Sequence, residues 1–179
     1  MNNMTIRKLH SDDYSRIEKH LLGLCKEDRE LRFGYAASDE NISEYIKRKS
    51  PEKTLNMGLL DGEGNVVALV EVYFDKSVDD FENDYAEIGL SVDPSQRGKG
   101  VGSLLFEYAV TFARNRGAKI LRSQCLMRNT WMRRIAQSHN MTLDSSYGES
   151  IGEMLLAPPN PESFMRELSA DGKSFPNRF

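Results

Sequence analysis

The segment SVDPSQRGKGVGSLLF, residues 91–106, restricts the possible folds of this chain more than any other stretch. Gly98, Gly100 and Gly102 alternate with other residues between an apolar run typical of a strand and an apolar run typical of a helix. A tight turn alone would need one glycine, at the position where the backbone takes a left-handed conformation. Three glycines therefore indicate a backbone that must stay uncovered by side chains.

A helix that begins near Gly100 explains this requirement. The first N–H groups of a helix have no partner within it and lie at the positive end of its dipole, so they attract anions. Arg97 and Lys99 add positive charge at the same place. The segment therefore predicts a site for a phosphate or diphosphate at the helix N-terminus. The alternative is a strand-to-helix turn without a ligand.

Two common phosphate-binding motifs do not fit the segment. A Walker loop needs Ser or Thr after its Gly-Lys pair, whereas Lys99 is followed by Gly100. A dinucleotide-binding loop follows the first strand of its domain, whereas several strand-like runs precede this segment. The sequence thus disfavours both an NTPase and a dinucleotide-binding enzyme.

Apolar periodicity and turn residues predict a mixed α/β domain around the glycine segment. A hairpin is predicted from two β-rich runs, 54–60 and 66–74, on either side of DGEGN. The further predicted strands are 4–9, 85–92, 118–127, 141–144 and 149–157, and the predicted helices start at Ser11, at 38–39, near Gly100 and at Asn129. Residues 27–38 are interpreted as an irregular connection. The predicted domain covers residues 1–157, and residues 158–179 are expected to be a loosely packed polar tail.

Composition narrows the classes of partner. The chain of 179 residues has 24 Lys and Arg against 27 Asp and Glu, so its net charge of −3 gives no reason to expect nucleic acid or an anionic membrane as the main partner. Cys25 and Cys125 lie far apart and have no metal-binding spacing, so no metal site is predicted. We expect a cytoplasmic protein, because no apolar stretch is long enough for a membrane span and the first residues lack the apolar core of a signal peptide.

The stretch QRGKGVG resembles the Q/R-x-x-G-x-G/A signature of the GNAT superfamily of N-acetyltransferases. The resemblance continues through RNTWMRRIAQSHNM, which is similar to the Asn-led helix after the fifth strand of that superfamily. DRELRF further resembles a segment of bacterial protein-lysine acetyltransferases. The resemblance implies a mostly antiparallel sheet with one parallel strand-helix-strand crossover and helices on both faces.

The resemblance also implies a ligand and the residues that hold it. The ligand would be acetyl-CoA, with CoA as product, and the backbone N–H groups of residues 97–103 would hold its diphosphate. The implied cofactor-binding residues are Leu90, Val92, Arg97, Gly98, Lys99, Gly100, Val101, Gly102, Ser103 and Asn129. A pantetheine arm can pair with a strand only where the neighbouring strand moves away. We therefore expect a bulge near Gly89 and a gap between strands 85–92 and 118–127.

Glu87 is the predicted catalytic residue. A lysine-like amine is mostly protonated at neutral pH and must lose a proton before it attacks a thioester. Glu87 lies in YAEIGLSV, which resembles the strand that carries the base in histone-modifying members of the superfamily. The opposing interpretation is a solvated strand residue. Many members have a tyrosine acid where this chain has Ala136, which leaves Tyr147, Cys125 or no protein acid at all.

The sequence is thus interpreted as an acetyl-CoA-dependent N-acetyltransferase in which an amine acceptor and the cofactor bind together. A strand amide near Leu90 is expected to stabilise the oxyanion. The alternative is an acyl-CoA-binding or sensing module without catalysis. The sequence leaves open whether the acceptor is a small-molecule amine or a protein amine. An acidic run, Asp79, Asp80, Glu82 and Asp84, is a candidate for attracting a cationic amine. Pairing of two copies through the last strands is compatible with the resemblance.

Overall fold

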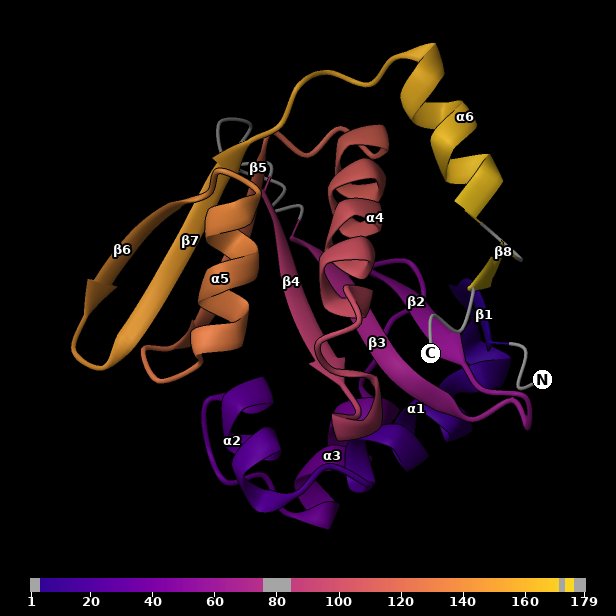
Figure 1. Ribbon diagram of the computed structural model, residues 1–179, viewed down its shortest axis with the longest axis vertical. Coiled ribbons are helices and arrows are strands. Elements are labelled where there is room, and N and C mark those ends of the chain that lie inside the picture. Colours follow the sequence, from indigo (N-terminus) through magenta and orange to yellow (C-terminus); the bar gives the residue numbers. More distant parts are fainter. Residues whose placement is uncertain (1–3, 76–84, 171–172, 176–179) are drawn as a thin grey trace.

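One eight-stranded mixed sheet organises the chain (Figure 1), in a computed structural model that describes residues 4–75, 85–170 and 173–175. The strand order is β6-β7-β5-β4-β3-β2-β1-β8. The strands are β1 Met4–Leu9, β2 Thr54–Leu60, β3 Val66–Asp75, β4 Tyr85–Val92, β5 Ile120–Leu126, β6 Thr142–Ser146, β7 Glu149–Leu155 and β8 Lys173–Phe175. The β4–β5 pair is parallel and the other pairs are antiparallel, so the predicted mixed sheet with one parallel crossover is confirmed.

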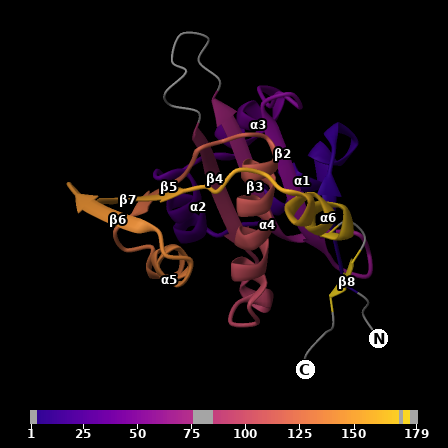
Figure 2. The same ribbon diagram turned by 90° about the horizontal axis from the view of Figure 1, so that it is seen from above.

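Helices cover both faces of the sheet (Figure 2), as predicted. The helices are α1 Tyr14–Leu22, α2 Lys26–Phe33, α3 Asp39–Lys47, α4 Val101–Asn115, α5 Thr130–Ser138 and α6 Pro161–Ala170. Alternation along β3 produces the two layers: Ala68, Val70 and Val72 join the core under α4, whereas Leu69 joins a separate core under α1 and α3. The glycine segment therefore lies at the start of the helix that covers the centre of one face.

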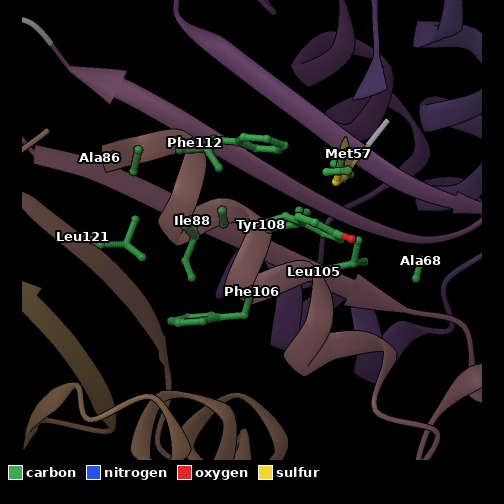
Figure 3. Packing of buried hydrophobic residues seen from close by; sticks show 14 of the residues in the cluster. Met57, Ala68, Ala86, Ile88, Leu105, Phe106, Tyr108, Phe112 and Leu121 are labelled. Carbon is green, nitrogen blue, oxygen red and sulfur yellow. The ribbon is translucent and has the colours of Figure 1, made fainter. Parts of the chain in front are cut away.

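The packing of α4 fixes the position of that segment. Its apolar stripe includes Leu105, Phe106 and Phe112, which are fully buried and pack over the strands in a cluster that also contains Met57 and Ile88 (Figure 3). Burying one such side chain contributes about 1.5–3 kcal/mol. The helix N-terminus, which follows directly after Gly100, is thus held firmly against β4.

The elements with clear local signals are confirmed. The hairpin turns at residues 61–65, where the Asp61 side chain accepts hydrogen bonds from the N–H groups of Glu63 at 2.9 Å and Asn65 at 2.8 Å. Ser38 caps α3 by accepting a hydrogen bond from Asn41. The prediction that a helix starts at Ser11 is wrong, because residues 11–13 form a single 3-10 turn and α1 begins at Tyr14.

Two predictions of irregular structure are wrong. Residues 27–38, interpreted as an irregular connection, contain most of helix α2. The stretch expected to be a loosely packed tail contains α6, which packs against α4, and β8, which pairs with β1. Glu167 of α6 is buried and forms ion pairs with Lys8 at 2.9 Å and Arg116 at 3.0 Å. These long-range contacts order a segment whose local sequence is polar.

Candidate functional site

The gap between β4 and β5 is the central feature of the site. The two strands pair only from Tyr85↔Ile120 to Glu87↔Arg122, although β4 continues to Val92 and β5 to Leu126. They diverge toward the end of the sheet where α2 lies (Figure 1), so the predicted gap is confirmed. The predicted bulge near Gly89 is wrong, because β3 and β4 pair in continuous register along the whole of β4. The sheet opens by displacement of β5 rather than by distortion of β4.

The three glycines serve two different structural purposes. Gly98 and Gly100 have φ angles of 74° and 78°, a left-handed conformation that side chains disfavour, and a Cβ on either would meet no atom within 4 Å. A Cβ on Gly102 would lie 3.0 Å from Ile135 Cδ1 of α5 and within 4 Å of Leu90 and Val92 of β4. Backbone conformation thus requires the first two glycines, and close approach of α4 to its neighbours requires the third.

The backbone donors expected at the helix N-terminus are in place. The first hydrogen bond of α4 runs from the Leu104 N–H to the Gly100 carbonyl oxygen at 3.0 Å. The N–H groups of residues 101–103 therefore have no acceptor within the helix. The Ser103 hydroxyl lies 2.9 Å from Nε2 of His139, whose ring stacks on Phe106. This contact orients the side chain of Ser103 and joins α4 to the end of α5.

A cavity opens directly onto these donors, and we call it the loop cavity. All the residues predicted to bind a cofactor line it except Lys99, namely Leu90, Val92, Arg97, Gly98, residues 100–103 and Asn129. Helix α2 forms the opposite wall with Asp28, Leu31 and Arg32. A narrow space bounded by free N–H groups, glycine Cα atoms and apolar side chains is suited to a ligand with a diphosphate and a slender arm.

The polar side chains at this cavity have definite partners. Arg97 forms an ion pair with Asp28 at 2.7 Å and donates from Nε to the Val92 carbonyl oxygen at 3.0 Å. Its charge is therefore balanced within the protein. Asn129 caps α5 by accepting a hydrogen bond from the Met132 N–H at 3.1 Å and donates to the Leu31 carbonyl oxygen at 3.3 Å. Asn129 is therefore the N-cap of α5, and its place on the cavity wall is compatible with the implied cofactor-binding role as well.

A second cavity, the sheet cavity, lies on the other side of α2 and contains Glu87. It is lined by residues 31–34, Tyr45, Tyr73, residues 87–89, residues 124–126 and Glu149. Glu87 is exposed and lies opposite Tyr73 on the neighbouring strand, whereas Ala86 and Ile88 are buried under α4. The two cavities share Leu31 and Arg32 as lining residues, so they adjoin at the C-terminal end of α2.

A buried ionic cluster that the sequence analysis missed lies beneath this junction. Glu71 of β3 is fully buried and forms ion pairs with Arg32 and Lys49, and it accepts a hydrogen bond from Tyr45 at 2.9 Å. The Tyr73 hydroxyl in turn donates to the Tyr45 hydroxyl at 2.8 Å. One sequence signal points to the cluster: Glu71 is the only charged residue within the apolar run VVALVEVYF, and a charge in a buried strand needs a partner.

Burial and charge within the cluster shift the pKa values of its members. Burial alone would raise the pKa of Glu71, but Arg32 and Lys49 lower it below its usual value. Burial lowers the pKa of Lys49 and, with the Glu71 charge, raises the pKa of Tyr73 to about 12. Burial acts against the charge of Arg32, yet Tyr45 and Glu71 raise the Arg32 pKa above its usual value. Arg32 and Glu71 therefore stay ionised, and Tyr73 stays protonated.

The other predicted candidates lie apart from this junction or outside the described residues. Tyr147 is fully exposed at the β6–β7 turn and lies in neither cavity. Cys125 lines the sheet cavity, and burial raises the pKa of its thiol. The acidic run from Asp79 to Asp84 falls outside the described residues. Within the described ranges, no cluster of metal-ligating side chains occurs, and no helix has the length and apolar character needed to cross a bilayer.

Comparisons with known proteins agree with this geometry. The model of the acetyltransferase (GNAT) family matches residues 7–141, and no curated protein matches the sequence. Among solved structures, the GNAT domain of S. lividans PAT is 21% identical, with a TM-score of 0.70 over 84% of this chain and 89% of that one. A Salmonella typhimurium protein solved with its cofactor acetyl-CoA is 19% identical, with a TM-score of 0.65 over 89% of this chain and 99% of that one. Spermidine N-acetyltransferase from Vibrio cholerae, solved with CoA and spermine, is 15% identical, with a TM-score of 0.62 over 85% of this chain and 95% of that one. At these identities the structures show a shared fold.

Proposed function

This chain belongs to the acetyltransferase (GNAT) family, and on that premise we propose that it transfers an acetyl group from acetyl-CoA to a primary amine. Acetyl-CoA binds in the loop cavity while the amine binds in the sheet cavity, and the amine attacks the thioester directly. The acetyltransferase domain comprises residues 1–157 together with α6 and β8, which pack against α4 and pair with β1. The proposal includes a cytoplasmic location, no nucleic-acid or membrane partner, and pairing of two copies through the last strands.

The observation that carries the proposal is the opening of the helix N-terminus onto a cavity that reaches the gap between β4 and β5. The N–H groups of residues 98–103 bind the diphosphate, and the side chains of Lys99 and Arg97 lie beside it. The Arg97 N–H, which was expected to join these donors, instead donates to the Pro94 carbonyl oxygen at 3.3 Å. The main-chain groups of Leu90 and Val92 pair with the pantetheine arm where β5 has moved away. Asn129 contacts the same arm from the start of α5. Acetyl-CoA supplies the activated acetyl group at the junction of the two cavities.

Glu87 acts as the general base in this scheme. Its side chain is exposed to the sheet cavity and lies next to the point where the β4–β5 pairing ends. A carboxylate there accepts a proton from the incoming ammonium group, directly or through water, and so produces the uncharged nucleophile. Tyr45 and Tyr73 line the same cavity and present aromatic surface to a cationic acceptor.

The test is a screen of small-molecule and protein amines with acetyl-CoA, with release of free thiol as the signal. With the amine that reacts best, Glu87→Gln should lower kcat by about 100-fold or more. Glu107→Gln is the matched control, because Glu107 is a carboxylate of α4 paired with Arg166 at 2.7 Å and lies in neither cavity. Unchanged turnover in Glu87→Gln would exclude Glu87 as the base. CoA binding without acetylation of any amine would instead favour an acyl-CoA-binding or sensing module.

A further inference from the structure

We propose that Arg32 is a further catalytic residue, whose guanidinium group donates hydrogen bonds to the carbonyl oxygen of the acetyl thioester. The inference rests on the proposed function, because it requires acetyl-CoA in the loop cavity and an amine in the sheet cavity. It assigns a side-chain donor to an oxyanion that the sequence analysis gave only to a strand amide near Leu90.

The position of Arg32 is the first observation. Arg32 lines both cavities, and its guanidinium group lies directly over Gly89 of β4, at the place that a Cβ on that glycine would fill. A thioester in the loop cavity can meet an amine in the sheet cavity only where the cavities adjoin. Gly89 therefore serves the close approach of Arg32 to the strand rather than a bulge.

An unused donor of Arg32 is the second observation. A guanidinium group has five N–H donors. Its Nη2 donates to Glu71 and, at 3.2 Å, to Tyr45. Within the described part of the chain, the buried Nε has no hydrogen-bond partner, although the side chain is only 10% exposed. Buried donors nearly always have partners in native proteins. The unpaired N–H of Arg32 is thus a preformed donor at the junction.

The charge of the cluster is the third observation. Glu71 supplies one negative charge, and Lys49 is fully buried against it. Lys49 alone balances that charge when it is protonated, so Arg32 is an additional buried cation. Keeping a buried charge without a full set of partners destabilises a fold. A role at the junction explains why an arginine occupies this position, because the charge acts where negative charge develops during acyl transfer.

The reaction step follows from this arrangement. The amine nitrogen forms a bond to the carbonyl carbon, and the electron pair of the C=O π bond moves onto oxygen, where the N–H groups of Arg32 stabilise it. The pair then returns to form C=O as the C–S bond breaks, and sulfur leaves with the bonding electrons as the CoA thiolate. The proton that the ammonium group loses before attack passes to Glu87, the proton that the nitrogen loses after attack passes to the CoA thiolate, and Arg32 keeps all its protons throughout.

The test compares Arg32→Met with Lys49→Met. Both variants remove one cationic partner of Glu71 and should lower the melting temperature similarly, but Lys49 lines neither cavity. The main measurement is the ratio of the affinities for acetyl-CoA and CoA by calorimetry, because CoA lacks the carbonyl group. The second measurement is kcat with the best amine. Arg32→Lys keeps the charge beside Glu71 and serves if Arg32→Met does not fold.

We expect the wild-type protein to bind acetyl-CoA about tenfold more tightly than CoA, and Arg32→Met and Arg32→Lys to lose most of that preference. Their kcat should fall by about 100-fold, whereas Lys49→Met should keep both values within about threefold of wild type. An unchanged affinity ratio in the Arg32 variants, or an equal loss in Lys49→Met, would overturn the inference. A change confined to the KM of the amine would also overturn it and place Arg32 in acceptor binding. If the wild-type protein binds neither acetyl-CoA nor CoA, the proposed function itself fails. If it binds both and the Arg32 variants keep the wild-type affinity ratio, only the role of Arg32 fails.

Discussion

Alanine at Gly100 should lower the free energy of unfolding, whereas alanine at Gly102 should not, because the two glycines are required for different reasons. Gly100 has a φ angle of 78° with open space around its Cα, whereas Gly102 lies in the first turn of α4 with Ile135 Cδ1 close to its missing Cβ. Alanine at position 100 therefore meets backbone strain, and alanine at position 102 meets one flexible side chain.

The magnitudes follow from these two environments. Left-handed backbone costs a non-glycine residue about 1–2 kcal/mol, and the lower entropy of the unfolded chain offsets about 0.4–1 kcal/mol, so Gly100→Ala should lose about 1 kcal/mol. In Gly102→Ala, the gain in helix propensity is up to about 1 kcal/mol, and a shift of Ile135 by a few tenths of an ångström offsets part of it. The free energy of unfolding of Gly102→Ala should thus equal or slightly exceed that of the wild type.

Thermal unfolding monitored by circular dichroism measures the difference. For a chain of this size, 1 kcal/mol corresponds to about 2–4 °C in Tm, so Gly100→Ala should melt at least that far below Gly102→Ala. Gly100→Asn is the control, because asparagine tolerates left-handed backbone better than alanine and should recover part of the loss. A Tm for Gly102→Ala below that of Gly100→Ala, or no recovery in Gly100→Asn, would refute the assignment of separate purposes to these glycines.

Three further predictions concern charged and titrating groups. Burial lowers the pKa of His20, whose Nε2 lies 2.8 Å from the Ser91 hydroxyl, from 6.5 to about 4. The unfolded chain therefore binds a proton before the folded protein does as the pH falls, and urea titrations should show the free energy of unfolding falling by up to about 3 kcal/mol between pH 6.5 and 4. His20→Gln should flatten this pH dependence. Despite burial, hydrogen bonds from Arg116 and Lys8 lower the pKa of Glu167 to about 2. The stability that the ionised carboxylate contributes to the docking of α6 is therefore present above pH 4.5 and is lost as the pH falls toward 2. Glu167→Gln should speed amide hydrogen exchange in α6 at pH 7, and unchanged exchange rates would contradict this role. Asp28→Asn removes a carboxylate from the loop cavity and frees the Arg97 side chain from its ion pair, so calorimetry should show CoA binding a few-fold more tightly at low salt. In 0.5 M salt this gain should shrink, and weaker binding of CoA by the variant at low salt would contradict the prediction.

The sequence predicted the elements whose signals are local. Alternating apolar residues and the DGEGN turn are enough to place the β2–β3 hairpin, and the apolar stripe after Gly100 is enough to place α4. Strand and helix periods are read from neighbouring residues, so such elements need no knowledge of tertiary contacts.

Helices α2 and α6 depend on distant partners and were missed for that reason. No residue of α2 is fully buried, and its position is set by ion pairs of Asp28 with Arg97, Glu30 with Arg128 and Arg32 with Glu71. Each of these pairs joins residues far apart in the sequence, and a polar octapeptide gives no periodic signal of such contacts.

The candidate site shows the same division. The glycine segment contains its binding groups in consecutive residues, so the side of the loop cavity that it forms could be anticipated, whereas the opposite wall formed by α2 could not. The junction of the two cavities could not, because Arg32, Lys49 and Glu71 come together only through the packing of α2 and the segment after α3 on β3. Glu87 was singled out from its strand, but the sheet cavity that it lines and its neighbours Tyr45 and Tyr73 were not anticipated.

The central claim is that the main-chain N–H groups of residues 98–103 bind the diphosphate of coenzyme A, and amide NMR tests it most directly. Titration of the wild-type protein with CoA should give its largest downfield amide proton shifts at Gly98, Gly100, Gly102 and Ser103. Titration with pantetheine, which lacks the diphosphate, should leave these signals almost unmoved. If CoA shifts none of these amides, or if pantetheine shifts them equally, the loop does not bind the diphosphate.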